Sequence, residues 1–127
     1  MVIYESIKCD LRKIEQYLKD WNVNLSNINV YINDGKWTFK TLGEVKIDGN
    51  IYVYLPKWIF MNRDKAIAKI ILHEYLHIKG IDRCLSNSKN CIMYEGSWYK
   101  EILIMSLQLM NNWSLCDKCK EFLNRME

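Results

Sequence analysis

The sequence lacks the long apolar segments that membrane proteins carry. Apolar runs such as Ile70–Leu72 and Ile102–Met105 are far too short for a bilayer, because a helix needs about 20 apolar residues to cross one. Behind Met1 the sequence also lacks the apolar core of a secretory signal peptide. We therefore expect a cytoplasmic protein without a membrane partner.

The sequence is equally poor in features of nucleic-acid-binding proteins. Its net charge is only +3, and no run of Lys and Arg forms an obvious basic patch. A zinc-ribbon contact with nucleic acid is therefore disfavoured, and we expect no nucleic-acid partner. Repeats, low-complexity segments and linkers are absent too. With 127 residues, 50% of them hydrophobic, the chain is expected to form a single domain with a real core.

Histidine is scarce: the chain has two, and both fall within one short motif. His73, Glu74 and His77 form HExxH, in which residues four apart are neighbours on one side of a helix. The two imidazoles can then share a zinc ion, and Glu74 lies where it can take a proton from an attacking water. Helical spacing alone gives the same pattern, so two hydrogen-bonded core histidines are the alternative interpretation.

The five cysteines are more typical of metal ligands than of disulfides in a reducing compartment. Cys116 and Cys119 form a CxxC pair, and Cys84 and Cys91 form a looser pair. Four thiolates make a closed, tetrahedral site of the kind that holds structural zinc. Cys9 is left over, and we expect a small buried apolar residue on the first helix.

Hydrophobic periodicity and turn residues predict a helix and then short strands in the first half of the chain. We expect the following elements: a helix over 6–20, a hairpin of strands 29–32 and 36–41 around Asn33-Asp34-Gly35, and a second hairpin around Asp48-Gly49 that is stopped by Pro56.

The second half is predicted to be mainly helical. Asn62 or Asp64 opens a helix that runs to about Lys79 and ends at Gly80. A loop over 84–96, a helix over 97–110 and a short helix after Cys116 follow. Because the strands precede most of the helices, the pattern predicts an α+β fold with an antiparallel or mixed sheet.

The motifs after the second histidine resemble those of the archaemetzincins, a family of small metzincin-like zinc peptidases. The resemblance covers about the C-terminal half, and the matching residues are His73, Glu74, His77, Gly80, Cys84, Cys91, Met93, Cys116 and Cys119. It implies a small metzincin-like domain with an upper part over 1–80 and a lower part over 81–127. It also implies two zinc ions, a catalytic one on the histidines and a structural one on the four cysteines.

The resemblance assigns two further roles. Met93 would form the turn beneath the catalytic zinc, and Ile51–Leu55 would be the edge strand on which an extended peptide substrate rests. Apart from the resemblance, a glycine at position 80 can leave the helix by a left-handed turn and so bring a third ligand back toward the metal, or it is an ordinary helix end.

The third ligand is where the chain departs from the family. Arg83 stands at the position of the family's third histidine, and its guanidinium has no lone pair for a metal. Asp82, one residue away, is our prediction for the third ligand, with Glu95 and Glu101 as alternatives. In the cleft, Arg83 would stabilise an oxyanion or a substrate carboxylate instead.

Two functions follow as hypotheses from these residues. The first is a zinc metallopeptidase that acts on peptides or unfolded proteins, with Glu74 as general base. The second is a catalytically impaired, zinc-stabilised binding module of the same fold, because Arg83 replaces a ligand. The number of zinc ions per chain distinguishes the two.

Overall fold

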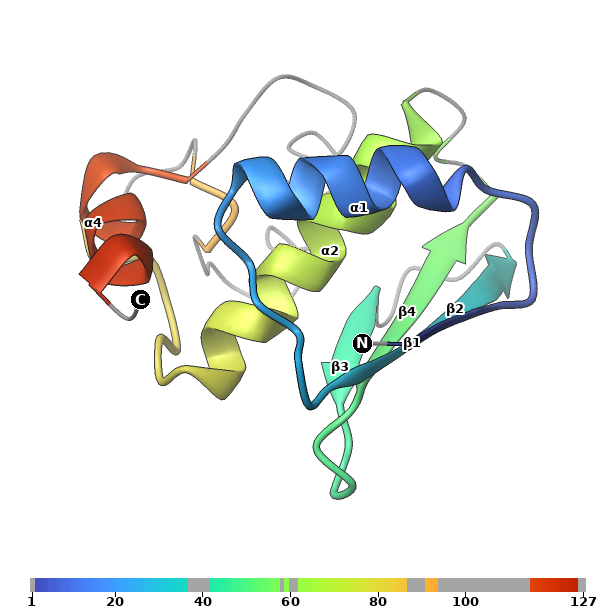
Figure 1. Cartoon of the computed structure of the whole chain (residues 1–127), viewed down its shortest axis with the longest axis horizontal. Coiled ribbons are helices and arrows are strands. Elements are labelled where there is room, and N and C mark those ends of the chain that lie inside the picture. Colours follow the sequence, from blue (N-terminus) through green and yellow to red (C-terminus); the bar gives the residue numbers. More distant parts are fainter. Residues whose placement is uncertain are drawn as a thin grey trace.

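The computed structural model describes residues 2–36, 42–57, 59, 62–86, 91–93 and 115–125 (Figure 1). The described elements are β1 (Val2–Glu5), α1 (Leu11–Asp20), β2 (Asn29–Lys36), β3 (Gly43–Val45), β4 (Ile51–Pro56), α2 (Arg63–Ile78) and α4 (Asp117–Arg125). The predicted helix over 97–110 and the predicted strand segment 37–41 lie outside the described residues. Among the described helices, none is long and apolar enough to cross a membrane.

The four strands form one mixed sheet in the order β1-β2-β4-β3. β1 pairs with β2 and β2 with β4 in parallel, whereas β3 pairs with β4 antiparallel. The predicted hairpin around Asp48-Gly49 joins β3 and β4, and Gly49 has a positive φ of 79° in its turn. The predicted α+β class with a mixed sheet is thus confirmed.

The other predicted hairpin is wrong, because β2 runs straight through Asn33-Asp34-Gly35. The sheet holds this segment extended by pairing it in parallel with β4, and the register shifts between Asp34 and Lys36. A Cβ at Gly35 would lie 2.9 Å from backbone atoms of Tyr54 and Leu55. The glycine is therefore needed for close approach of two strands, which turn rules do not anticipate.

The N-terminal segment also differs from the prediction. Residues 6–10 precede α1, which begins at Leu11 because the Asp10 carboxylate caps it by accepting hydrogen bonds from the N–H groups of Arg12 and Lys13. Ahead of the helix, β1 was not predicted at all. Its pairing depends on β2, more than 20 residues away, where the Tyr4 ring stacks on Tyr31 with centroids 4.8 Å apart.

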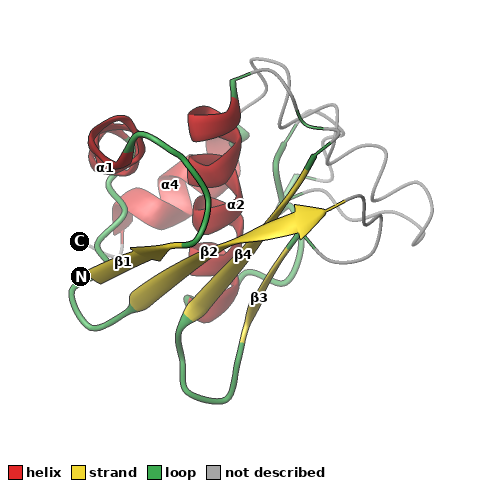
Figure 2. Ribbon diagram, turned by 90° about the vertical axis from the view of Figure 1, so that its right-hand side faces the viewer, coloured by secondary structure: helices red, strands yellow, loops and turns green. Residues whose placement is uncertain are grey.

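The helix α2 occupies the centre of the molecule. Its residues 66–76 are all buried, which a one-sided amphipathic helix would not allow. It packs against α1 and against β3 and β4, and the described helices lie on one side of the sheet (Figure 2). As predicted, the helix ends before Gly80, whose φ of 107° lets the chain turn away.

The expectation that Ile51–Leu55 forms an edge strand is also wrong. Ile51–Leu55 belongs to β4, which lies between β2 and β3, so it has no free edge. Among the described strands, β1 and β3 lie at the two edges of the sheet, and the Asp48-Gly49 turn places β3 beside β4. Of these two outer strands, β3 is the one that lies against Glu74 of α2, through Gly43.

Candidate functional site

His73 and His77 lie one turn apart on α2 and face each other. Their Nε2 atoms are 2.9 Å apart, and the two rings meet edge to face with centroids 4.5 Å apart. The opposite nitrogen of each ring is held by a backbone carbonyl. Nδ1 of His73 lies 2.8 Å from the Ile92 oxygen, and Nδ1 of His77 lies 2.8 Å from the Ile81 oxygen.

These contacts fix the tautomers. A carbonyl oxygen only accepts, so both Nδ1 atoms donate, and both Nε2 atoms then present lone pairs to each other. Such a contact needs a shared proton or a cation between the two nitrogens. If a zinc ion lay at the usual distance of about 2.0–2.1 Å from both Nε2 atoms, its two Zn–N bonds would meet at an angle of about 90°. This angle is narrower than the tetrahedral angle of about 109° that zinc prefers, so the two nitrogens would have to move slightly apart to share a zinc ion.

His73 is held neutral. Its side chain is 6% exposed, and burial, assisted by the neighbouring His77, lowers its pKa to about 4. The hydrogen bond to Ile92 opposes this shift without cancelling it. An uncharged imidazole is the form that binds a metal, so His73 is ready to coordinate at neutral pH.

Glu74 is buried next to the edge strand. Glu74 is 7% exposed, and a Cβ placed on Gly43 of β3 would lie 3.3 Å from the Glu74 Oε1 atom. The same Cβ would lie 2.7 Å from Cγ2 of Ile70, a distance that real Cβ atoms essentially never show. Glycine at position 43 thus permits the close contact between β3 and the part of α2 that carries Glu74.

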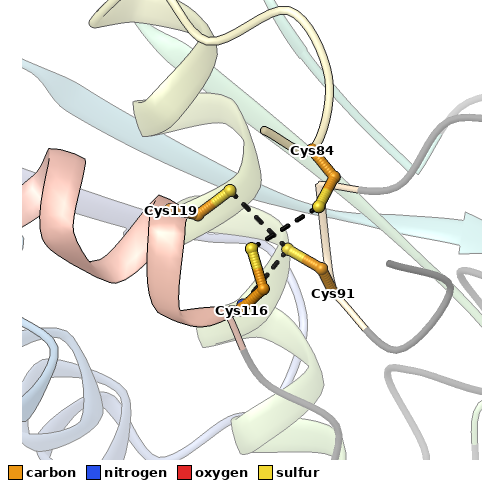
Figure 3. A group of neighbouring side chains, drawn as sticks. All are labelled: Cys84, Cys91, Cys116 and Cys119. Carbon is orange, nitrogen blue, oxygen red and sulfur yellow. Dashed lines mark hydrogen bonds between the residues drawn. The ribbon is translucent and has the colours of Figure 1, made fainter. Parts of the chain in front are cut away.

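The four cysteines that the sequence grouped converge on one point (Figure 3). All four Sγ atoms lie within 4.8 Å of one another, with 3.5 Å between Cys84 and Cys116 and 3.8 Å between Cys91 and Cys119. Tetrahedral zinc with Zn–S bonds of about 2.3 Å sets its sulfurs about 3.8 Å apart. The four cysteines are therefore positioned to hold a metal ion, consistent with structural zinc.

The thiols of this cluster have unequal acidities. Burial raises the pKa of Cys91 and raises that of Cys119 to about 12. Burial acts in the same direction at Cys116, but hydrogen bonds from Ser86 and from the Cys119 backbone outweigh it and lower the pKa to about 6. Because only thiolates ligate, a metal must displace protons from the cluster as it binds.

Backbone hydrogen bonds also join the segments that carry the cysteines. The N–H of Cys84 donates to the Met93 oxygen at 2.7 Å, and Cys91 Sγ accepts from the N–H groups of Met93 and Cys116 at 3.4 Å each. Met93 is fully buried, in a turn that follows Cys91. Its expected role beneath a catalytic zinc stays a prediction.

The structure does not bring a third ligand to the histidines from the residues it describes. Among these residues, the four cysteines form the only group of three or more potential ligands that converge. Asp82 and Arg83 are both exposed after α2. Glu95 and Glu101 lie outside the described residues, so the identity of a third ligand stays a prediction.

The position that we predicted for Cys9 is wrong. It lies before α1 rather than on it, is only half-buried, and donates from Sγ to the Glu5 carboxylate at 3.0 Å. Burial and then this acceptor raise its pKa to about 12, so the thiol stays protonated.

Sequence reasoning missed three parts of the site: the carbonyls of Ile81 and Ile92 and the glycine at position 43. A backbone carbonyl leaves no trace in residue identity, so nothing in the sequence would have revealed the first two. Gly43 carried a weak signal, since glycine within an alternating strand often marks a close backbone approach.

Comparisons of the chain with protein-family models, with curated proteins and with solved structures found no match.

Proposed function

We propose that the protein is a zinc-dependent metallopeptidase. The observation that carries the proposal is the approach of the His73 and His77 Nε2 atoms to 2.9 Å, beside a buried Glu74. A pair of histidines whose other nitrogens both donate to carbonyls is typical of metal ligands held by outer partners. An acid placed next to such a pair on the same helix is typical of a general base for hydrolysis.

Each residue has a distinct role in this proposal. His73 and His77 would hold the ion through Nε2, and the bound zinc would supply a more acidic water and a polarised substrate carbonyl. Glu74 would accept the proton of the attacking water and pass it to the leaving amine. Burial at 7% exposure supports this role, because a carboxylate shielded from bulk solvent meets less competition from other water.

The substrate would lie along β3. As one of the two outer strands of the described sheet, β3 offers backbone groups that an extended peptide can pair with. Gly43 lies against Glu74, so a peptide paired with this strand would pass close to the proposed base. Arg83, exposed just beyond α2, would bind a substrate carboxylate or stabilise the oxyanion.

The ion needs at least one further ligand, because catalytic zinc sites have three protein ligands and an open position. Asp82 is the proposed third ligand, and Glu95 and Glu101 are the alternatives. Asp82 lies on the segment that follows Ile81, whose carbonyl already contacts His77.

The test replaces Glu74 with Gln, which keeps size and hydrogen bonding but removes the basic carboxylate. We expect cleavage of an unfolded protein substrate to fall by at least a hundredfold, while elemental analysis still finds two zinc ions per chain. Glu15→Gln, an exposed change on α1, is the matched control and should leave both quantities unchanged. Cleavage retained by Glu74→Gln contradicts the proposal.

The second candidate is a zinc-stabilised binding module without catalysis. It is favoured by the finding that only the four cysteines form a group of three or more converging ligands among the described residues. It predicts one zinc ion per chain and no cleavage by the unaltered protein. The zinc content from the same experiment therefore separates the two candidates.

A further inference from the structure

The same two segments contact the histidine pair and contribute two of the four cysteines to the cluster. Ile81, which accepts from His77, lies three residues before Cys84, and Ile92, which accepts from His73, directly follows Cys91. Whatever fixes the two cysteines in space thus also fixes the two carbonyls that orient the imidazoles.

The two segments are joined to each other as well. The hydrogen bond from the Cys84 N–H to the Met93 oxygen, at 2.7 Å, ties the segment after α2 to the segment around Cys91. The Cys116 N–H reaches Cys91 Sγ at 3.4 Å and adds the start of α4 to this network. On α4 itself only Cys119 and Leu123 are buried, so the sulfurs are a main attachment of that helix.

We propose that a metal ion in the four-cysteine cluster is a positioning device for the histidine site. With the ion bound, Cys84 and Cys91 hold the Ile81 and Ile92 carbonyls against the imidazoles. Without the ion, no metal joins the four thiols to one another, and the two carbonyls are no longer held against the imidazoles. The histidines then bind zinc tightly only after the cysteines are filled. This inference rests on the proposed histidine zinc site.

The physical basis is the histidine tautomer. A carbonyl that accepts from Nδ1 keeps the proton off Nε2 and leaves that lone pair free for the metal. A ring that loses this partner rotates and places its proton on either nitrogen, so part of the population cannot coordinate. Loss of such an outer partner typically weakens metal binding about 10–100-fold, and here both rings lose one together.

The experiment compares Cys119→Ser with the unaltered chain. Cys119 lies on α4, remote in sequence from Ile81 and Ile92, so the change removes one of the four thiolates and leaves the residues of both carbonyl segments as they are. Zinc is titrated while ¹⁵N spectra of the histidine rings are recorded; both signals are assignable because the chain has two histidines. We expect zinc affinity at the histidines to fall at least tenfold and the Nδ1–H form to lose its dominance.

Cys9→Ser is the matched control, since Cys9 lies outside the cluster, and it should change neither quantity. Unchanged histidine affinity in a folded Cys119→Ser chain overturns the proposal.

A second measurement decides the matter if Cys119→Ser does not fold. Coupling between two sites is reciprocal, so zinc on the histidines must tighten the cysteine site by the same factor. The affinity of the cysteines for Co²⁺ is followed by their thiolate absorption against a chelator, at a free Co²⁺ concentration that also fills the histidines of the unaltered chain. It should therefore be at least tenfold weaker in His77→Ala. Equal affinities overturn the proposal.

Neither measurement uses a peptide. Coupling without cleavage would contradict the peptidase and support this inference, and cleavage without coupling would do the reverse.

Discussion

Among single residues, His73 has the clearest consequence for pH, because its pKa in the folded chain is about 4 rather than 6.5. Between these values the unfolded chain binds a proton at His73 and the folded chain does not. Its contribution to the free energy of unfolding is therefore complete above pH 6.5 and is lost as the pH falls toward 4, on the order of 3 kcal/mol in all. We predict that stability declines faster from pH 7 to pH 5 in the unaltered chain than in His73→Asn.

Urea unfolding at several pH values, with one equivalent of zinc for the cysteines, measures both slopes. If the free energy of unfolding falls equally with pH in both chains, burial of the His73 imidazole does not cause the loss of stability in acid.

Single residues also show what the sequence could and could not reveal about the site. The helical placement of HExxH and the helix end before Gly80 are confirmed, because helical spacing and a helix end depend on near neighbours in the chain. The cysteine cluster was predictable because thiols are few and have distinctive chemistry. The carbonyls of Ile81 and Ile92 were not predictable, because every residue has one and only the folded backbone decides where it points.

At the scale of elements, the contact between β3 and α2 depends on the missing side chain of Gly43. An added methyl group would lie 2.7 Å from Ile70 and would press on Glu74. We predict that Gly43→Ala lowers the free energy of unfolding by about 1–3 kcal/mol, as overpacking does, and also slows cleavage by displacing Glu74.

The neighbouring Glu44→Ala, at a half-buried position of the same strand, serves as control and should change stability by no more than about 0.5 kcal/mol. Urea unfolding measures both variants. A Gly43→Ala chain as stable as the control would mean that the helix and strand can separate without penalty.

Elements also explain where prediction of the fold failed. α2 and the β3–β4 hairpin were predicted because their signals, periodicity and an Asp-Gly turn, lie within the element. β1 and the full length of β2 were missed because both depend on parallel pairing with strands distant in sequence. Asn33-Asp34-Gly35 has the composition of a turn, but pairing with β4 keeps it extended.

At the scale of the whole molecule, the cysteine cluster joins α4 to the segments that follow α2. Metal binding to such a site contributes on the order of 10 kcal/mol of apparent free energy in small modules. We predict that Cys116→Ser lowers Tm by about 10 °C or more, since each kcal/mol corresponds to several degrees in a domain of this size.

Thermal unfolding followed by circular dichroism measures this change, and a chelator should lower the Tm of the unaltered chain in the same way. Cys9→Ser should keep the original Tm. An unchanged Tm in Cys116→Ser would exclude a structural metal on these thiols.

The placement of the last two cysteines also sets an order of events during synthesis. The sheet and the helix that bears both histidines lie within residues 2–78, whereas Cys116 and Cys119 lie well after α2 in the sequence and leave the ribosome later. A growing chain can fold its sheet and central helix before the thiol ligands are complete. Under the coupling proposed above, the histidines of a nascent chain would bind zinc tightly only once α4 has docked and its thiols complete the cluster.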